Sequence, residues 1–404
     1  MLSKKFSTLD YFYNRSHGML QLVLKFDDTS KIEETIDKLS KNVLAFHLKT
    51  DEYHFYKQKS NITPVKIIES DNLPDLATYM YENHSPDFSK TLATLGYNSN
   101  TLVLNIAHLV ADGGYLHQIV DLILSDSDKL NTKLEFPDNI EENFINQINS
   151  KYIDQCKYIF TDPEIIRINA DKPKNPSNKY AKHCYINTPV ENLKCFSKKS
   201  KRVSGLTEVL WTSYILSASA MNKKINNTGI ATCIDMRNYF NQINKTNSLS
   251  VCNHYSNITP CSNISPSMTV GELGKQMRKD FNDKIKKGHH YSFLKSLVPP
   301  EAKAIPGIGL ELSNIGRFQI KSPLKDLFLK SSVFDQFCDP LISHSSFSVD
   351  TGVKNTLHGM FRFKPSAIKE ETVRELASKV KFSLQNISND MTVAESISLI
   401  QKSN

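Results

Sequence analysis

The 404-residue sequence lacks several features that mark whole classes of protein. No stretch approaches the roughly 18 consecutive apolar residues of a membrane-spanning helix, and residues 1–18 contain no apolar run followed by a small-residue cleavage site. The net charge of +8 comes from scattered lysines, without the basic, aromatic-interleaved stripe of nucleic-acid-binding proteins. We therefore expect a cytoplasmic protein that is neither secreted nor membrane-spanning and does not bind nucleic acid.

Cysteine usage excludes two further classes. The chain has seven cysteines, an odd number spread along its length, which indicates a reducing compartment and no disulfide framework. Cys252, His254 and Cys261 lie close together in the sequence, but no CxxC or HxxxH pair joins them. We expect no metal site and no permanently bound cofactor.

The composition is that of a globular protein. With 39% hydrophobic and 23% charged residues, the chain can bury one large or two medium cores. Residues 170–182 form the clearest linker, because prolines, lysines and asparagines replace apolar residues there. This predicts an N-terminal subdomain, 1–172, and a C-terminal subdomain, 173–404. The alternative is a long surface loop within one domain.

Strands and helices alternate in both halves, which favours α/β layers over a bundle or a sandwich. Hydrophobic periodicity predicts strands at 19–26, 44–48, 53–56, 101–108, 183–187, 229–234, 309–312 and 357–363. It predicts helices at 32–40, 114–124, 207–221 and 371–384. The last segment, 393–400, is interpreted as a helix packed on the protein body, with an amphipathic lipid anchor as the alternative.

The most informative stretch reads NIAHLVADGG and contains His108. Alternation over 101–107 predicts a half-buried strand that ends at this histidine, and Gly113 and Gly114 permit a tight turn before a helix. An imidazole, with an unperturbed pKa near 6.5, can take a proton from a hydroxyl or amine at neutral pH. Asp112 can hold the turn or the imidazole, or pair with a distant arginine. The alternative is a core histidine followed by an ordinary helix N-cap.

At these residues the chain resembles a known superfamily. His108, Asp112 and Gly113 match the HxxxDG signature of CoA-dependent acyltransferases, which include chloramphenicol acetyltransferase, peptide-synthetase condensation domains and fungal alcohol acetyltransferases. Three further segments are similar to the opening segment of fungal alcohol acetyltransferases, the DxR strand and the SNxG strand: Leu9–Arg15, Ile234–Arg237 and Leu312–Arg317. Condensation domains usually carry a second histidine where this chain has Ala107. The fungal alcohol O-acetyltransferase family therefore fits best.

The resemblance implies a fold and a reaction. The fold would consist of two similar subdomains of mixed β-sheet flanked by helices, like chloramphenicol acetyltransferase, with the active site in a cleft or tunnel between them. Acetyl-CoA would be the cosubstrate, and an alcohol would attack its thioester directly. Transfer to a lipid-like amine and a catalytically inactive binding relative remain alternatives. We expect a monomer, and contact with the endoplasmic reticulum or lipid droplets is left open.

The resemblance also assigns roles to residues. His108 would be the general base, and Asp112 would form a structural ion pair with Arg237, supported by Gly113.

Two residues of the SNxG strand would border the reaction. Ser313 or Asn314 could donate a hydrogen bond to the oxyanion of a tetrahedral intermediate. For Asn314 and Gly316 a bulge or turn that closes the strand is the alternative. His344 is a further candidate for the acceptor pocket, together with Ser345 and Ser346.

Overall fold

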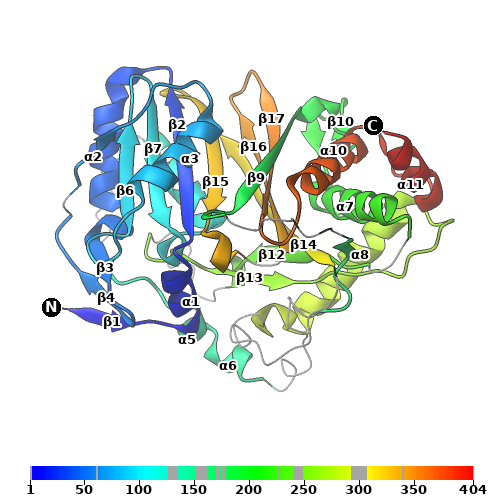
Figure 1. Ribbon diagram of the computed structural model, residues 1–404, viewed down its shortest axis with the longest axis horizontal. Coiled ribbons are helices and arrows are strands. Elements are labelled where there is room, and N and C mark those ends of the chain that lie inside the picture. The colour runs from blue at the N-terminus through cyan, green and yellow to red at the C-terminus, as the bar shows by residue number, and fades with distance from the viewer. Residues whose placement is uncertain are drawn as a thin grey trace.

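Two lobes, each built on a β-sheet flanked by helices, make up the protein (Figure 1). The computed structural model describes residues 2–60, 62–125, 135–150, 162–169, 171, 173, 178–224, 228–239, 249–292, 307–338 and 341–403. Sheets flanked by helices in both lobes confirm the predicted α/β architecture. Within the described ranges, no helix combines the length and the apolar character needed to cross a membrane.

The sheet of the N-terminal lobe has five strands in the order β15-β2-β7-β6-β5. Their bounds are β2 (Met19–Phe26), β5 (Val65–Lys66), β6 (Ala93–Tyr97), β7 (Thr101–Ala107) and β15 (Leu324–Ser332). Every residue of β7 is buried, so the prediction of a half-buried strand is wrong. The reason is its central position, where α3 (Leu73–His84) covers the face that carries polar Asn105. This amide accepts a hydrogen bond from Gln21 Nε2 at 2.8 Å, which makes its burial tolerable.

Smaller elements complete this lobe. They are β1 (Ser3–Lys5), β3 (Leu48–Thr50), β4 (His54–Lys57), α1 (Thr8–Ser16), α2 (Ile32–Asn42), α4 (Gly113–Leu124), α5 (Ile140–Asn143) and α6 (Ile145–Ile148). The strand predicted at 44–48 is instead a 3₁₀ turn, Leu44–His47, followed by β3. Its first three residues are all buried, and such a continuous apolar run does not distinguish a strand from a tight helical turn.

The C-terminal lobe contains a seven-stranded sheet in the order β13-β12-β14-β16-β17-β9, with β8 paired to β14. These strands are β8 (Arg167–Ile168), β9 (Lys182–Pro189), β12 (Ala231–Asp235), β13 (Tyr255–Ile258), β14 (Ile308–Gln319), β16 (Leu341–Asp350) and β17 (Asn355–Phe363), and a separate hairpin joins β10 (Phe196–Ser197) to β11 (Arg202–Val203).

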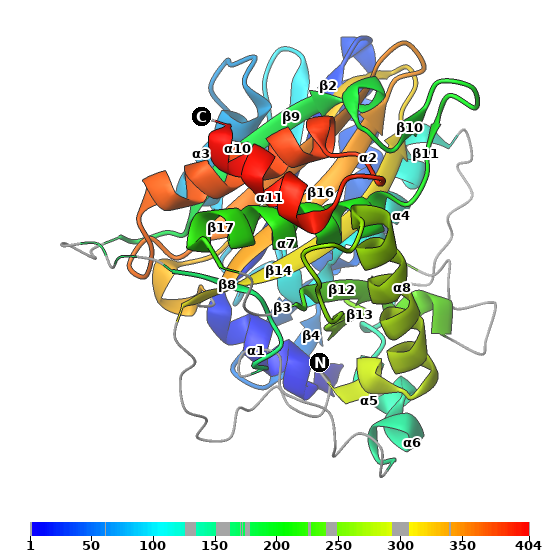
Figure 2. The same ribbon diagram turned by 90° about the vertical axis from the view of Figure 1, so that its right-hand side faces the viewer.

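Among the described residues of this lobe, four helices accompany the sheet (Figure 2). They are α7 (Leu206–Asn222), α8 (Val270–Lys286), α10 (Glu370–Asn386) and α11 (Val393–Lys402). Helix α11 buries Val393 and Ile400 in the same core as α7 and α10, so the interpretation as a packed helix is confirmed.

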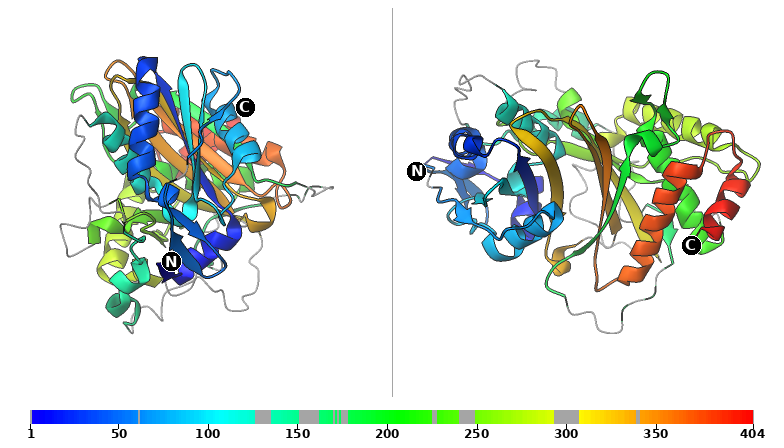
Figure 3. Two further views of the ribbon diagram at one scale, coloured as in Figure 1. Left: turned by 90° about the vertical axis from the view of Figure 1, so that its left-hand side faces the viewer. Right: turned by 90° about the horizontal axis from the view of Figure 1, so that it is seen from above.

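Strand β15 ties the C-terminal half of the chain back to the N-terminal lobe. Although β15 lies late in the sequence, it pairs antiparallel with β2 in the N-terminal sheet. Viewed from above, the two sheets face one another (Figure 3). Phe328 on β15 packs against Phe347 on β16, with ring centroids 5.8 Å apart, and so closes part of the space between them. The division at residue 172 stays a prediction, and residues 170, 172 and 174–177 of the predicted linker lie outside the described ranges.

Candidate active site

A pocket of about 230 Å³ lies between the two sheets. The N-terminal lobe contributes α1, β2, β15 and the start of α4, and the C-terminal lobe contributes β12, β13, β14, β16 and β17. All six site residues predicted from the sequence line it: His108, Asp112, Gly113, Arg237, Ser313 and Asn314. The structure therefore gathers residues from distant parts of the chain into one cavity.

His108 follows the last residue of β7 and is held on several sides. Its backbone N donates to Gly18 O at 2.8 Å, and its carbonyl accepts from Asn253 Nδ2 at 2.8 Å. The imidazole stacks on the Tyr13 ring, with centroids 4.2 Å apart and planes 11° from parallel. The residue is partly exposed and lines the pocket.

The environment keeps this imidazole neutral at pH 7. Burial lowers the pKa of His108 to about 4, while carbonyls of the nearby backbone and the charge of Asp112 act in the opposite direction. The guanidinium of Arg362 contributes a further lowering of this pKa. A neutral imidazole that faces a pocket can accept a proton, which a charged one cannot.

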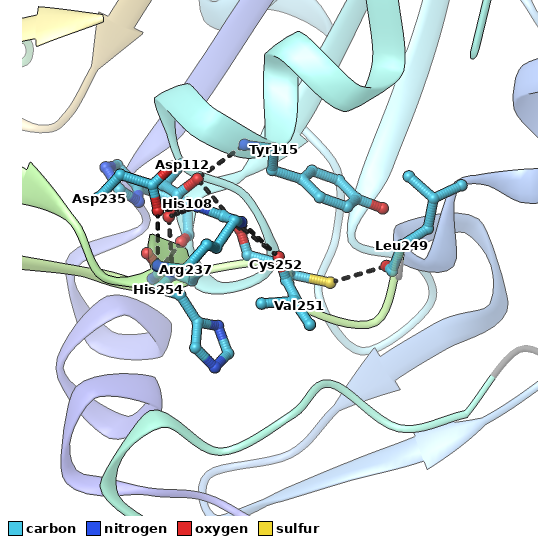
Figure 4. A network of polar contacts seen from close by, with 10 residues as sticks. His108, Asp112, Tyr115, Asp235, Arg237, Leu249, Val251, Cys252 and His254 are labelled. Atoms are coloured by element: carbon cyan, nitrogen blue, oxygen red, sulfur yellow. Dashed lines mark hydrogen bonds and ion pairs between the residues drawn. The ribbon is translucent and has the colours of Figure 1, made fainter. Parts of the chain in front are cut away.

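Asp112 has both of the roles that the sequence left as alternatives. It is the N-cap of α4, because Oδ1 accepts from Tyr115 N at 2.8 Å. It also forms a bidentate ion pair with Arg237 at 2.8 and 3.0 Å, and Oδ2 accepts from His254 N at 2.7 Å (Figure 4). Burial alone would raise the pKa of Asp112, but the Arg237 charge and these hydrogen bonds hold it below its usual value.

Arg237 connects the start of α4 to the C-terminal lobe. Its side chain is 6% exposed, and it also donates to Asp235 Oδ1 at 3.0 Å and to the carbonyls of Val251 and Cys252. Burial acts to lower its pKa, but the two aspartates raise the pKa above the usual value. Asp112 belongs to the HxxxDG segment, and Asp235 and Arg237 belong to the DxR segment. Asp112 and Arg237 are 125 positions apart in the sequence.

The glycines of the motif have a different purpose from the predicted one. Neither Gly113 nor Gly114 has a positive φ, so the explanation by an unusual turn is wrong. A Cβ on Gly114 would lie 2.6 Å from Arg237 Nη1 and 2.8 Å from Asp235 Oδ2. On Gly113 it would lie 3.1 Å from a carbon of Ile315. Glycine is needed because the C-terminal lobe packs directly against the first turn of α4.

The SNxG strand contains a bulge, as the alternative for Asn314 predicted. The register between β14 and β16 shifts between Asn314 and Gly316, which has a φ of 105°. Asn314 Nδ2 donates to Thr207 Oγ1 at 3.0 Å. Ser313 is partly exposed and lines the pocket.

Several pocket residues were not found from the sequence. They are Tyr13, Tyr255, Glu311, Ser343 and Arg362, all in the pocket lining, and the two tyrosine hydroxyls share a short hydrogen bond. No local signal in the sequence marks them: along β16 the partly exposed serines at 343 and 345 alternate with buried residues, but the buried positions 344 and 346 are polar too. His344 is one of these buried residues and contacts Tyr214 and Phe361, so the suggestion that it lines the pocket is wrong.

Comparisons with known proteins identify the fold but no sequence family. No family model and no curated protein matches the sequence. The first condensation domain of the calcium-dependent antibiotic synthetase is similar in structure, with a TM-score of 0.67, 10% identity, and coverage of 98% of this chain and 99% of that one. The chain has the fold of condensation domains and CoA-dependent acyltransferases.

Two further solved structures share this fold. The TRI3 trichothecene 15-O-acetyltransferase from Fusarium sporotrichioides gives a TM-score of 0.64 at 10% identity, with 95% of each chain covered. The starter condensation domain of rhizomide synthetase, in complex with C8-CoA and Leu-SNAC, gives 0.63 at 8% identity, with 96% of each chain covered. Likeness at such identities concerns the architecture, so the chemistry has to be argued from the pocket of this chain.

Proposed function

We propose that this protein is a CoA-dependent O-acyltransferase, in which His108 acts as general base. The observation that carries the proposal is the position of a neutral, partly exposed imidazole in a pocket between the two sheets. The ring is held by Tyr13, and the turn behind it is held by the buried pair of Asp112 and Arg237. A base that is fixed in orientation and open to a cavity suits proton transfer to or from a bound substrate.

The reaction needs no covalent enzyme intermediate. His108 takes the hydroxyl proton of the acceptor as its oxygen forms a bond to the thioester carbon. The tetrahedral intermediate collapses, the carbon–sulfur bond breaks, and the leaving CoA sulfur receives the proton from His108. Ser313 is the better placed of the two predicted oxyanion donors, because the Asn314 amide donates to Thr207. One such donor is worth about 2.7–4 kcal/mol in the transition state.

Within acyl transfer, an acetyl group from acetyl-CoA and an alcohol acceptor are the specific proposal. Its support is the resemblance to fungal alcohol acetyltransferases, together with a structural neighbour named as an O-acetyltransferase and another solved with C8-CoA. The same proposal includes a monomeric, cytoplasmic enzyme whose N-terminal subdomain ends at residue 172. Contact with the endoplasmic reticulum or lipid droplets is not needed for it.

A thiol-release assay tests the proposed activity. Purified protein, acetyl-CoA and a panel of alcohols, sterols and sphingoid amines are compared with the His108→Ala variant. We expect release of CoA with a member of the panel, and a loss of at least about a hundredfold in the variant, because general base catalysis contributes about 10²–10⁴.

The matched control is His54→Ala, which removes a partly exposed histidine outside the pocket. Its rate should equal that of the wild type. Equal rates in the wild type and in His108→Ala would remove His108 from the mechanism, and an inactive wild type that still binds acetyl-CoA would favour the inactive binding relative.

A further inference from the structure

One wall of the pocket is polar where a sheet face inside a protein is usually apolar. On the C-terminal sheet, Glu311 on β14 is in register with Ser343 on β16, which is in register with Arg362 on β17. Two positions along, Ser313 is in register with Ser345. All five residues are partly exposed and line the pocket. Residues two apart on a strand share a face, so this polar wall faces the cavity that contains His108.

Glu311 is the acidic member of this wall. Its Oε1 accepts from Asn257 Nδ2 at 3.0 Å and from Cys233 Sγ at 3.8 Å. Among the described residues, none donates a hydrogen bond to its other carboxylate oxygen, and no basic side chain lies within ion-pair distance. Arg362 lies two strands away across Ser343, and its Nη1 donates to Ser331 Oγ at 2.8 Å.

The Glu311 carboxylate lies in the same pocket as His108. Tyr255 lines the same pocket, its hydroxyl is paired with that of Tyr13, and its ring centroid is 5.9 Å from that of His108. A carboxylate in a partly desolvated cavity gains most from a ligand that brings a positive charge and N–H donors. Neutral aliphatic alcohols bring neither.

We propose that Glu311 is a specificity-determining residue that binds an ammonium group on the acceptor, so that the acceptor is an amino alcohol. This inference rests on the proposed acyl transfer and names its acceptor class. The hydroxyl reacts at His108 while the ammonium group pairs with Glu311. Ser343 and Ser345 supply hydroxyls that can contact the polar part of the same molecule.

The experiment compares two acceptors of equal carbon length, hexanol and 2-aminohexanol, with acetyl-CoA. Glu311→Gln keeps the shape of the side chain and removes its charge. We expect the wild type to prefer the amino alcohol, and the variant to raise KM for it at least about tenfold while leaving hexanol unchanged. Glu311→Asp, which keeps the charge on a shorter side chain, should retain part of the preference.

Glu191→Gln is the control, because it removes an exposed carboxylate outside the pocket and should leave both acceptors unchanged. A wild type without preference between the acceptors, or an equal loss for both in Glu311→Gln, overturns the proposal. If no acceptor releases CoA, the proposed function fails, and calorimetric binding of 2-aminohexanol decides the inference separately. Weaker binding to Glu311→Gln than to the wild type supports it, and equal or absent binding overturns it.

Discussion

At the scale of single residues, the ion pair of Asp112 and Arg237 is the feature on which the site's geometry depends. Both side chains are at most 6% exposed, and each satisfies the other's buried charge with two hydrogen bonds. An isolated charge at that depth would be strongly unfavourable. The pair also connects the end of the histidine turn to the opposite lobe, so it links stability to the position of the base.

Asp112→Asn should therefore lower both stability and activity. The substitution leaves the Arg237 charge without its buried counter-charge, and breaking such a pair from one side costs about 3–5 kcal/mol. Urea unfolding measures the free-energy change, and the thiol-release assay measures the rate. Asp235→Asn is the control, because the Asp235 side chain pairs with the same guanidinium but is 40% exposed. We expect it to lower the free energy of unfolding by less than about 1 kcal/mol. A purely kinetic defect in Asp112→Asn, with unchanged unfolding, would contradict the structural role.

At the scale of elements, the first turn of α4 is constrained by what packs on it. Gly114 has an ordinary φ, so helix propensity alone would favour alanine there by about 1 kcal/mol. The contact with Arg237 predicts instead that alanine at position 114 destabilises the protein. The two effects can be separated experimentally.

We expect Gly114→Ala to destabilise the protein by roughly 1–3 kcal/mol, because the new Cβ would lie 2.6 Å from Arg237 Nη1 and displace the guanidinium. Thermal and urea unfolding measure the change. Gly274→Ala in α8 is the matched control, since its Cβ would meet Glu208 at an ordinary 3.5 Å, and it should be neutral or slightly stabilising. Stabilisation by Gly114→Ala would show that the close approach is absent.

Local patterns predicted many of these elements and missed others. Apolar periodicity located β2, α2, α4, α7 and α10 because each buries one face or a continuous run of its own residues. Helix α8 was missed although Thr269 and Glu272 form a capping box at its start, a signal readable in the sequence. Strand β16 was missed because its pocket-facing positions 343 and 345 are polar, and β15 because charged residues at 325, 326 and 330 interrupt its apolar residues.

At the scale of the whole molecule, buried histidines make stability depend on pH. Burial lowers the pKa of His290 and His358 to about 4 and that of His344 to about 3, and it also lowers the pKa of His108 and His183. In the unfolded chain these groups titrate near 6.5. The unfolded state therefore binds more protons below that pH, and stability falls as the pH falls.

We expect the free energy of unfolding to be maximal at and above pH 7, and to decrease from about pH 6.5 towards pH 4. Urea titrations at pH 7.5, 6.5 and 5.5 measure this slope. His344→Leu should reduce the slope, because it removes a buried imidazole that packs on Tyr214 and Phe361. Stability independent of pH over this range would contradict the burial of these imidazoles.

The sequence alone determined the layer architecture, the helices α2, α4, α7, α10 and α11, and the HxxxDG and DxR residues, because periodicity and short motifs act over a few neighbouring positions. Only the tertiary structure decided that Asp112 caps a helix and pairs with Arg237 at once, and that β15 joins the N-terminal sheet. It also decided that Glu311 faces the histidine pocket. Apart from the helix cap, which joins Asp112 to Tyr115 three positions away, these contacts join residues more than a hundred positions apart, and no local pattern encodes which distant side chains will meet.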